Sequence, residues 1–531
     1  MQGKKVYQEK LFNSFQLSNR VPKENFYRRL KESLDLKFLY TMTAPLYGDT
    51  GNPSIDPVVF FKLMLVGYLE NITSDRKLIE HCNMRLDILY FLDYDIDETL
   101  SWHSTVSRTR QLYGEKIFEE LFSKVFSMCV EGGMVSGHTQ AVDSALIKAN
   151  ASMESLEKKQ PSQPLGEYFT TSRDANDEPR RPAKTNKAGE DQRRVTSTDE
   201  QLNELESRNN YFREKKIEKF GNKIKDSFES FSNQTYYSPS DPDARVSTKP
   251  GKPRRLNYLC SMATDTAQGV ISHVQADFAD KKDSRYLADI TERTKGELKQ
   301  NNMQLENLLA DAGYSSGKNY HEMEGTGIRA YIPVSGVYKH EREGFTYDKE
   351  RNCFVCKNDK HLIFKKTFTD RKERKLKQYR STRKDCKDCI FKQSCIGLKG
   401  HEKKIEVSFY QQEYERAWQR QQTKYFKRMI KLRHSTIERV FGSLINYYGL
   451  RKINVKGIKG AHKSMLMAAV AYNLKKLMKF LSHKPSSNLE AMQRELCAFT
   501  QTIFPDLITT LLSYPKFSFA YPMLKKQRLN K

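Results

Sequence analysis

The sequence predicts an α/β protein in which a mixed sheet with flanking helices follows an all-helical N-terminal region. Capped apolar segments at helical spacing fill residues 1–132. Further on, two apolar strands flank the turn sequence "DTAQG". The segment containing "LLADAGYSS" (308–316) reads as strand, turn, helix and strand. Hairpin strands that alternate with helices and a later strand are typical of a mixed sheet.

The chain is strongly basic. Of its 531 residues, 91 are Lys or Arg and 65 are Asp or Glu, which gives a formal net charge of +26. This charge makes nucleic acid the expected partner, because neutralised phosphates release counterions whatever the base sequence. A merely soluble basic protein is the alternative interpretation.

Several features bear on the compartment. No apolar run approaches the roughly 18 residues that a membrane helix needs. The N-terminal sequence "MQGKKVYQEKLF" lacks the apolar core of a signal peptide. The nine cysteines, five of them within 353–395, suit metal ligation in a reducing compartment better than a disulfide framework. We therefore expect a cytoplasmic, nucleoid-associated protein without a membrane partner.

The helices of residues 1–132 suit a DNA reader. In "HSTVSRTR", Ser104 can cap a helix whose first turns carry Arg108 and Arg110. Short capped helices of this kind fit a helix-turn-helix-like arrangement. Helical spacing alone does not separate this interpretation from a packing or dimerisation module.

The α/β region is expected over residues 137–480, with two insertions. Its first strand lies in "GHTQAVDSALIKANAS". Residues 153–250 are rich in charged and polar residues, so we expect a flexible insertion with one amphipathic helix near 217–231. Residues 335–410 form a second, cysteine-rich insertion, and 481–531 a C-terminal helical tail.

Three carboxylates in this region could do chemistry. Asp143 interrupts an apolar strand, where a charge is costly unless it is paired or metal-bound. Asp311 ends another strand, and Glu438 lies beside the apolar face of a helix, between Arg433 and Arg439. Such carboxylates could hold two Mg²⁺ or Mn²⁺ ions that act on a phosphodiester. Each alone is more often structural, and other aspartates compete: Asp265, Asp277, Asp280 and Asp283.

The clustered cysteines have the spacing of a zinc ribbon. They fall into one pair separated by two residues and a further group of three: Cys353, Cys356, Cys386, Cys389 and Cys395. Paired knuckles of this kind supply four thiolates in tetrahedral geometry. Free thiols are the alternative, and five thiols are one too many for a single zinc ion.

Taken together, the motifs resemble bacterial insertion-sequence transposases with a ribonuclease H-like Asp-Asp-Glu domain and an InsH-type helical N-terminal domain. The similar stretches are "GNPSIDPVVFFKLMLVGYL", "SDRKLIEHC", "HSTVSRTR", "AVDSALIKANAS", "LLADAGYSS" and "IERVFGSL" with "AAVAYNLKKL". They span residues from about 25 to 480, apart from the charged insertion. By this resemblance, Asp143 and Asp311 are the two aspartates and Glu438 the glutamate.

The resemblance implies a ribonuclease H-like mixed sheet and a DNA transposase. Such an enzyme binds the terminal inverted repeats of its element, cleaves phosphodiester bonds with divalent metal and joins 3′-OH ends to target DNA. It also implies double-stranded DNA as partner, at the element ends and the target, and a homodimer or higher oligomer. Four cysteines match those of the similar transposases, which leaves Cys353 as the spare: Cys356, Cys386, Cys389 and Cys395.

The sequence departs from the family pattern around the glutamate. Related transposases often place a tyrosine seven residues before it, an arginine four before it and a lysine seven after it; here these positions hold Lys431, His434 and Ile445. Arg433 or Arg439 would then replace the arginine. A catalytically inactive or domesticated transposase that acts as a sequence-specific DNA-binding protein is the alternative function, and a nuclease without strand transfer is a third.

Overall fold

The computed structural model describes residues 16–48, 54–159, 233–247, 253–335, 338, 341–370, 373–397 and 399–482. The chain divides into two compact units, 1–478 and 479–531, and of the second unit only the end of one helix is described. The helix expected near 217–231 and the tail beyond residue 482 lie outside the described residues.

The N-terminal region is helical, as predicted. Its central helix is buried on almost all sides, and Asp56 caps it by accepting hydrogen bonds from the backbone nitrogens of Val58 and Val59 at 2.6 and 3.1 Å. The elements are α1 (Leu17–Arg20), α2 (Phe26–Ser33), α3 (Phe38–Thr43), η1 (Ala44–Leu46), α4 (Pro57–Leu69), α5 (Asp75–Asn83), α6 (Leu86–Leu92), α7 (His103–Leu112) and α8 (Glu115–Glu131).

A six-stranded mixed sheet forms the centre of the α/β region. β1 lies between antiparallel β5 and parallel β7, β8 pairs in parallel with the far edge of β7, and β6 and β4 pair antiparallel with the far edge of β5. The strands are β1 (Thr139–Lys148), β4 (Arg245–Ser247), β5 (Arg255–Asp265), β6 (Ile271–Phe278), β7 (Asn307–Leu309) and β8 (Arg329–Tyr331). The mixed sheet that the sequence predicts is therefore confirmed.

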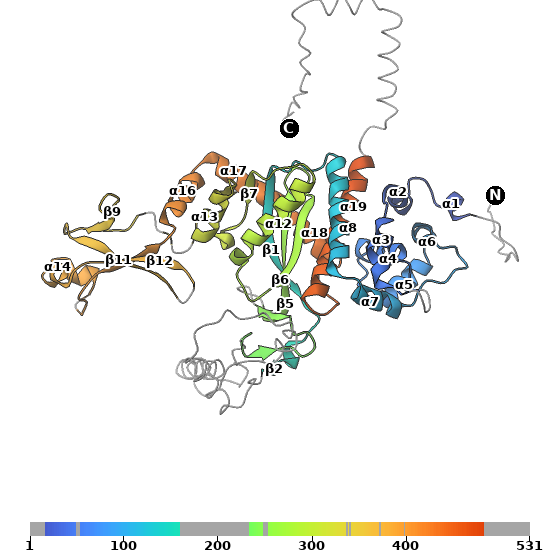
Figure 1. Cartoon of the computed structure of the whole chain (residues 1–531), viewed down its shortest axis with the longest axis horizontal. Helices are drawn as coiled ribbons and strands as arrows, with labels where there is room; N and C mark the ends of the chain where they lie inside the picture. The colour runs from blue at the N-terminus through green and yellow to red at the C-terminus, as the bar shows by residue number, and fades with distance from the viewer. Residues whose placement is uncertain are drawn as a thin grey trace, which may run out of the picture. The chain divides into compact units, whose positions relative to one another are not determined.

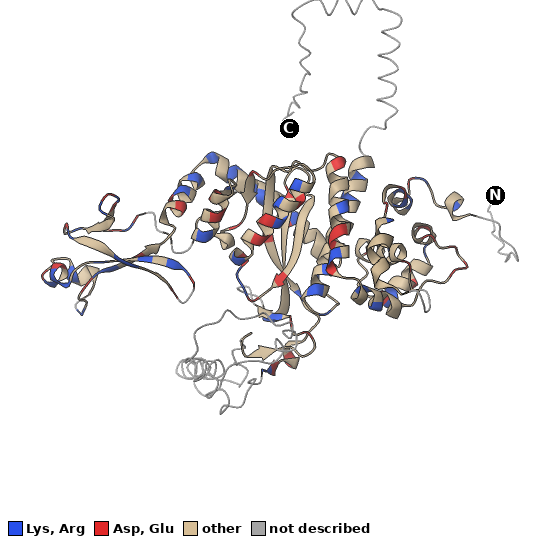
Figure 2. Cartoon of the chain, viewed as in Figure 1, with Lys and Arg blue, Asp and Glu red and all other residues tan. Residues whose placement is uncertain are grey.

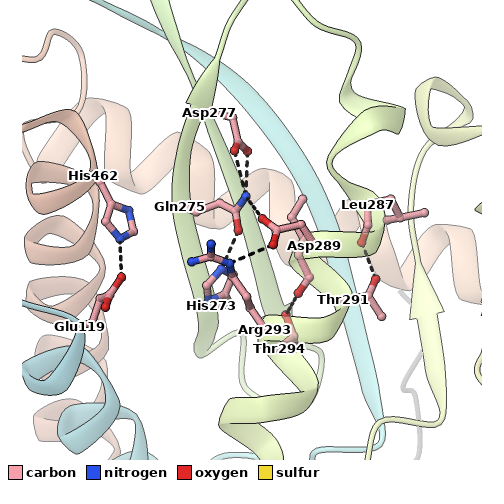
Figure 3. A network of polar contacts seen from close by, with 11 residues as sticks. Glu119, His273, Gln275, Asp277, Leu287, Asp289, Thr291, Arg293, Thr294 and His462 are labelled. Carbon is pink, nitrogen blue, oxygen red and sulfur yellow. Dashed lines mark hydrogen bonds and ion pairs between the residues drawn. The ribbon is translucent and has the colours of Figure 1, made fainter. Parts of the chain in front are cut away.

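Helices cover the sheet. α12 packs against β5 and β6, and in Figures 1 and 3 it lies in front of these strands. α19 is fastened to the sheet by its buried Asn473, whose side-chain amide exchanges two 2.9 Å hydrogen bonds with the backbone of Ile271 in β6. The helices are α12 (Leu287–Gln300), α13 (Gly317–Gly325), α16 (Gln411–Gln421), α17 (Lys424–Arg433), α18 (Arg439–Tyr447) and α19 (Ile458–Ser482).

None of the helices in the described part of the chain combines the length and the apolar character that crossing a lipid bilayer requires.

A polar network that is buried on β6 and partly exposed on α12 joins these two elements (Figure 3). Along β6, His273 Nε2 lies 2.9 Å from Gln275 Oε1, and Gln275 Nε2 donates to Asp277 Oδ1 at 2.9 Å. The same amide nitrogen donates to Asp289 of α12 at 2.9 Å, and Arg293 donates to the other oxygen of Asp289 at 3.1 Å. Asp277, a competitor of the catalytic aspartates in the sequence, therefore has structural partners.

Asp265 has a structural role too. It is fully buried at the β5–β6 hairpin and accepts hydrogen bonds at 2.9 Å from the backbone nitrogen of Gly137 and from Gln140 Nε2. As its place in the turn sequence "DTAQG" suggests, its Oδ1 also accepts a hydrogen bond from the backbone nitrogen of Ala267 in the turn, at 2.9 Å.

Part of the charged insertion has regular structure. Residues 233–247 were expected to be flexible, but they include β3 (Tyr236–Tyr237) and β4, which joins the central sheet. Asp241 is buried there, accepting hydrogen bonds from the hydroxyl of Tyr258 at 2.6 Å and the backbone nitrogen of Gly457 at 3.0 Å. These contacts with distant residues hold a stretch whose composition predicts no core. Its other described elements are η2 (Met153–Ser155) and β2 (Glu157–Lys158).

The cysteine-rich insertion forms its own antiparallel sheet, in the order β13-β12-β11-β10-β9. One face carries a small apolar core of Phe354, Leu362, Tyr379, Ile405 and Val407. The elements are β9 (Phe345–Asp348), β10 (Cys353–Cys356), β11 (His361–Thr369), β12 (Lys375–Arg380), α14 (Arg383–Lys387), α15 (Lys392–Cys395) and β13 (Lys404–Ser408).

Candidate active site

Two of the expected catalytic carboxylates belong to neighbouring parallel strands. Asp143 lies within β1, and Asp311 follows β7 by two residues. Because Ala141 of β1 pairs with Leu309 of β7, two further residues along each strand bring both aspartates to the same level of the sheet. Both are partly exposed. Asp311 also serves its turn, accepting a hydrogen bond from the backbone nitrogen of Gly313 at 2.9 Å.

Tyr314 braces these two segments against each other. Its hydroxyl lies 2.7 Å from Oγ of Ser144, the residue after Asp143. Burial raises the pKa of Tyr314 well above its ordinary value, and the charges of Asp143, Asp283 and Asp311 raise it further. The phenol therefore stays protonated and hydrogen-bonded, and it holds the turn after β7 next to β1.

Glu438 lies on a turn of unusual helical geometry. α17 passes into the π-helical turn η5 (His434–Glu438), which continues as α18 and packs against β1 and β5. Such single π turns within helices are frequent at functional sites. The Glu438 side chain is 55% exposed, and its Oε1 lies 2.5 Å from Nδ1 of His434.

Arg433 connects the helix carboxylate with the strand carboxylate. Its Nη2 donates to Oδ2 of Asp143 at 2.7 Å, and its Nη1 lies 3.9 Å from Oε1 of Glu438. The Arg433 side chain is only 4% exposed. Because a π turn spans one residue more than an α turn, the residue five positions before Glu438 comes to its side as well as His434, four positions before it.

A divalent cation fits the chemistry of this site, although the side chains are not arranged around one. Asp143, Asp311 and Glu438 offer only oxygen donors, which Mg²⁺ and Mn²⁺ prefer. Among the described residues, however, no three His, Cys, Asp or Glu side chains are grouped so as to hold a metal ion. The positive charge next to Asp143 belongs instead to Arg433. A cation bound to Asp143 would have to share the carboxylate with the Arg433 guanidinium or displace that guanidinium.

The structure gives internal partners to two of the four arginines expected to bind DNA. Arg433 binds Asp143, and Arg110 of α7 donates from Nη1 and Nη2 to both carboxylate oxygens of Asp75 at 3.0 and 2.6 Å. Arg110 therefore fastens α7 to α5, a role that the helical pattern did not indicate. Arg108 and Arg439 are exposed, and their contact with DNA stays a prediction.

Four of the five clustered cysteines line a common hollow of about 250 Å³: Cys356, Cys386, Cys389 and Cys395. Cys353 is instead buried in β10, with Sγ 3.4 Å from Nδ1 of His361. The hollow thus gathers the set of four that the resemblance implies. These thiols are not drawn together around a metal ion, so zinc stays a prediction.

Sequence reasoning missed the residues that support the carboxylates. Tyr314 lies inside "LLADAGYSS", three residues after Asp311, so the sequence already placed it close to a predicted catalytic aspartate. Nothing in the sequence indicates that Ser144 is its partner. In the family pattern the arginine stands four residues before the glutamate, whereas here Arg433 stands five residues before it and His434 takes the family position. This difference was visible in the sequence, but its structural basis, the π turn, was not.

Two family models match the chain. A transposase domain of the DUF772 family matches residues 15–112, and a transposase DDE domain matches residues 355–478. The first match covers α1–α7, and the second contains Glu438, Arg433 and Arg439 but not Asp143 or Asp311. No curated protein matches the chain.

Proposed function

We propose that this chain, which matches two transposase domain models, is an insertion-sequence transposase that binds the inverted repeats of its element, cleaves a phosphodiester there and joins the 3′-OH end to target DNA. The observation that carries the proposal is the meeting of Asp143 and Glu438 at Arg433, beside the strand end that bears Asp311. The strand order around β1, with antiparallel β5 on one side and the parallel strands β7 and β8 on the other, supports a ribonuclease H-like catalytic domain.

In this proposal Asp143, Asp311 and Glu438 hold the divalent cations. When bound, two Mg²⁺ or Mn²⁺ ions activate the attacking hydroxyl and stabilise the leaving oxygen. Arg433 positions Asp143 and offers cationic charge near the scissile phosphate. His434 orients the carboxylate of Glu438 through the 2.5 Å contact. Tyr314 keeps the two aspartate-bearing segments in register.

We propose that the helical N-terminal region, residues 1–132, recognises DNA, with α7 and its exposed Arg108 facing the element ends. The cysteines that line the common hollow are proposed to hold a structural zinc ion. We further propose that the enzyme acts on DNA in the cytoplasm as a homodimer or larger assembly, because two element ends must be brought together.

The proposal is tested with DNA that carries the sequences flanking the gene. The wild-type chain is expected to produce Mg²⁺-dependent nicks that leave a 3′-OH, and then joined products with a plasmid target. Asp143→Asn, Asp311→Asn and Glu438→Gln should each abolish both products while retaining binding of the same DNA, because metal ligands serve chemistry and phosphate contacts carry affinity.

Asp280→Asn is the matched control, since Asp280 also competes in the sequence but pairs with Arg245 at 3.7 Å. It should cleave as the wild type does. Near-wild-type cleavage by any of the three carboxylate variants would remove that residue from the site. Binding without cleavage by the wild type would favour the inactive, repressor-like alternative, and nicks that are never joined would favour a nuclease.

A further inference from the structure

A second hollow in the cysteine-rich insertion is lined almost entirely by basic side chains. It measures about 300 Å³ and lies beside α14 and α15. Figure 2 shows Lys and Arg along the strands of this small sheet and at α14. The lining residues are Arg383, Lys384, Lys387, Lys392, Gly400 and His401. We refer to this feature as the basic hollow.

The charges of the basic hollow have no acidic partner among the described ion pairs. Two of its lysines contact each other: Lys392 Nζ donates a hydrogen bond to the backbone oxygen of Lys387 at 3.5 Å. The nearby carboxylate of Asp385 is used as a helix cap, accepting from the backbone nitrogen and the hydroxyl of Thr382 at 3.2 and 2.5 Å. Four full positive charges thus share one hollow, and among the described residues none of them forms an ion pair with a carboxylate.

Two other basic residues of the same sheet do have an acidic partner. Arg380 and Lys404 lie on adjacent strands, and both bind the carboxylate of Glu402, at 3.2 and 3.5 Å. Like charges that converge without partners repel one another, and an anion that enters the hollow removes that repulsion.

The chemistry of the lining favours phosphate. Lys supplies mobile point charges and Arg a rigid fork, and both bind phosphate oxygens, whereas base edges call for few, precisely held donors. Three of the four full charges are lysines, and Lys384 and Lys387 are exposed. An open hollow ringed by exposed cations suits a run of backbone phosphates better than one enclosed anion.

We propose that the basic hollow binds phosphate groups of the DNA backbone and makes the insertion a second DNA-contacting element. The choice of DNA, rather than another polyphosphate, rests on the proposed function. The contact adds affinity without reading sequence, because lysine–phosphate pairs do not distinguish bases.

The test is the salt dependence of DNA binding by the full chain without divalent cations. Lys384→Gln/Lys387→Gln is titrated against a fluorescent random duplex of about 30 base pairs over a series of KCl concentrations. Each phosphate contact contributes about 0.9 to the slope of log affinity against log salt, so the slope should fall by about 2. Lys349→Gln/Lys365→Gln, two exposed lysines of the same insertion outside the hollow, should keep the wild-type slope.

Three results would overturn the proposal. The hollow variant could keep the wild-type slope, or the control could lose as much as the hollow variant, which would indicate a general charge effect. In the third result, inorganic phosphate raises the melting temperature of the wild type more than KCl does at equal ionic strength, while the hollow variant keeps the wild-type salt slope of DNA binding. The hollow would then be a site for a free anion. Because no cleavage is measured, this outcome is independent of whether the chain cuts DNA.

Discussion

Arg433 donates a hydrogen bond from Nη2 to Oδ2 of Asp143 at 2.7 Å, across 290 residues of sequence. The pair joins the end of α17 to the middle of β1, and its arginine side chain is 4% exposed while that of Asp143 is 18% exposed. The same guanidinium approaches Glu438. Arg433 therefore places one positive charge next to two carboxylates, which lowers their mutual repulsion.

Arg433→Gln is expected to destabilise the metal-free protein. It leaves Asp143 without its counter-charge, which we expect to cost about 1–3 kcal/mol because the carboxylate retains some solvent. Added Mn²⁺ should raise the melting temperature of this variant more than that of the wild type, since the cation then supplies the missing charge. Differential scanning fluorimetry with and without Mn²⁺ measures both effects.

Arg439→Gln is the matched control on the same helix, because Arg439 is exposed. It should melt as the wild type does at every Mn²⁺ concentration. If Arg433→Gln also melts like the wild type, Arg433 does not compensate the carboxylates.

The two arginines of α7 should behave differently. Arg110→Ala breaks the ion pair with Asp75, in which the Arg110 side chain is 14% exposed and the Asp75 side chain 23% exposed. The variant should therefore destabilise the N-terminal domain by about 2 kcal/mol. Arg108→Ala should leave stability unchanged and weaken DNA binding, with a loss of about 1–3 kcal/mol if it reads a base. Urea unfolding and titration against end-sequence and scrambled duplexes separate the effects.

Asp75→Asn should reproduce the instability of Arg110→Ala, since it removes the other half of the pair. If instead Arg108→Ala binds both duplexes as the wild type does, α7 is a packing element, and recognition of the ends has to be sought elsewhere in the chain.

The central sheet and its aspartates could be predicted because each strand is a short apolar run that a single charge interrupts or ends. Asp143 and Asp311 are visible in that way, and a parallel pairing of their strands is enough to bring them to one level. Local patterns sufficed to place each aspartate on its strand, because the apolar run that marks the strand lies next to the aspartate in the sequence.

The environment of Glu438 could not be predicted in the same way. An α-helical period places His434 beside the glutamate and gives Arg433 no defined partner. Whether a helix admits an extra residue is decided by its packing against β1 and β5, which helical spacing does not record. Composition likewise predicted a flexible stretch around Asp241, whose hydrogen bonds come from Tyr258 and from Gly457, more than 200 residues away.

The cysteine hollow predicts a zinc content of about one per chain. Cys386→Ser should lose the metal and increase hydrogen exchange across the small sheet β9–β13, because a tetrahedral site with one thiolate removed holds zinc weakly. Cys353→Ser should keep it, since Cys353 lies in β10 against His361 and not at the hollow. Mass spectrometry for zinc on the reduced protein decides the matter, and a metal-free wild type would exclude the site.

His273 predicts a loss of stability in mild acid. Burial lowers its pKa from 6.5 to about 4, so above pH 6.5 the ring is neutral in both the folded and the unfolded chain. As the pH falls below 6.5, His273 becomes protonated in the unfolded chain but stays neutral in the folded chain. At pH 5 this difference lowers the free energy of unfolding by about 2 kcal/mol. His273→Gln, which keeps a hydrogen-bonding group for Gln275, should lose correspondingly less stability between pH 7 and pH 5. Urea unfolding at both pH values measures the difference.

The other charged groups of the network are present in both proteins, so the comparison isolates the imidazole. Burial raises the pKa of Asp277, which acts in the opposite direction, because its protonated form favours the folded chain and that contribution disappears as the pH rises. His138→Gln is the control, since the His138 side chain is 66% exposed, and it should lose as much stability as the wild type between pH 7 and pH 5. An equal loss of stability in the wild type and in His273→Gln would show that the ring of His273 is protonated within the folded network, at the cost of some other contact.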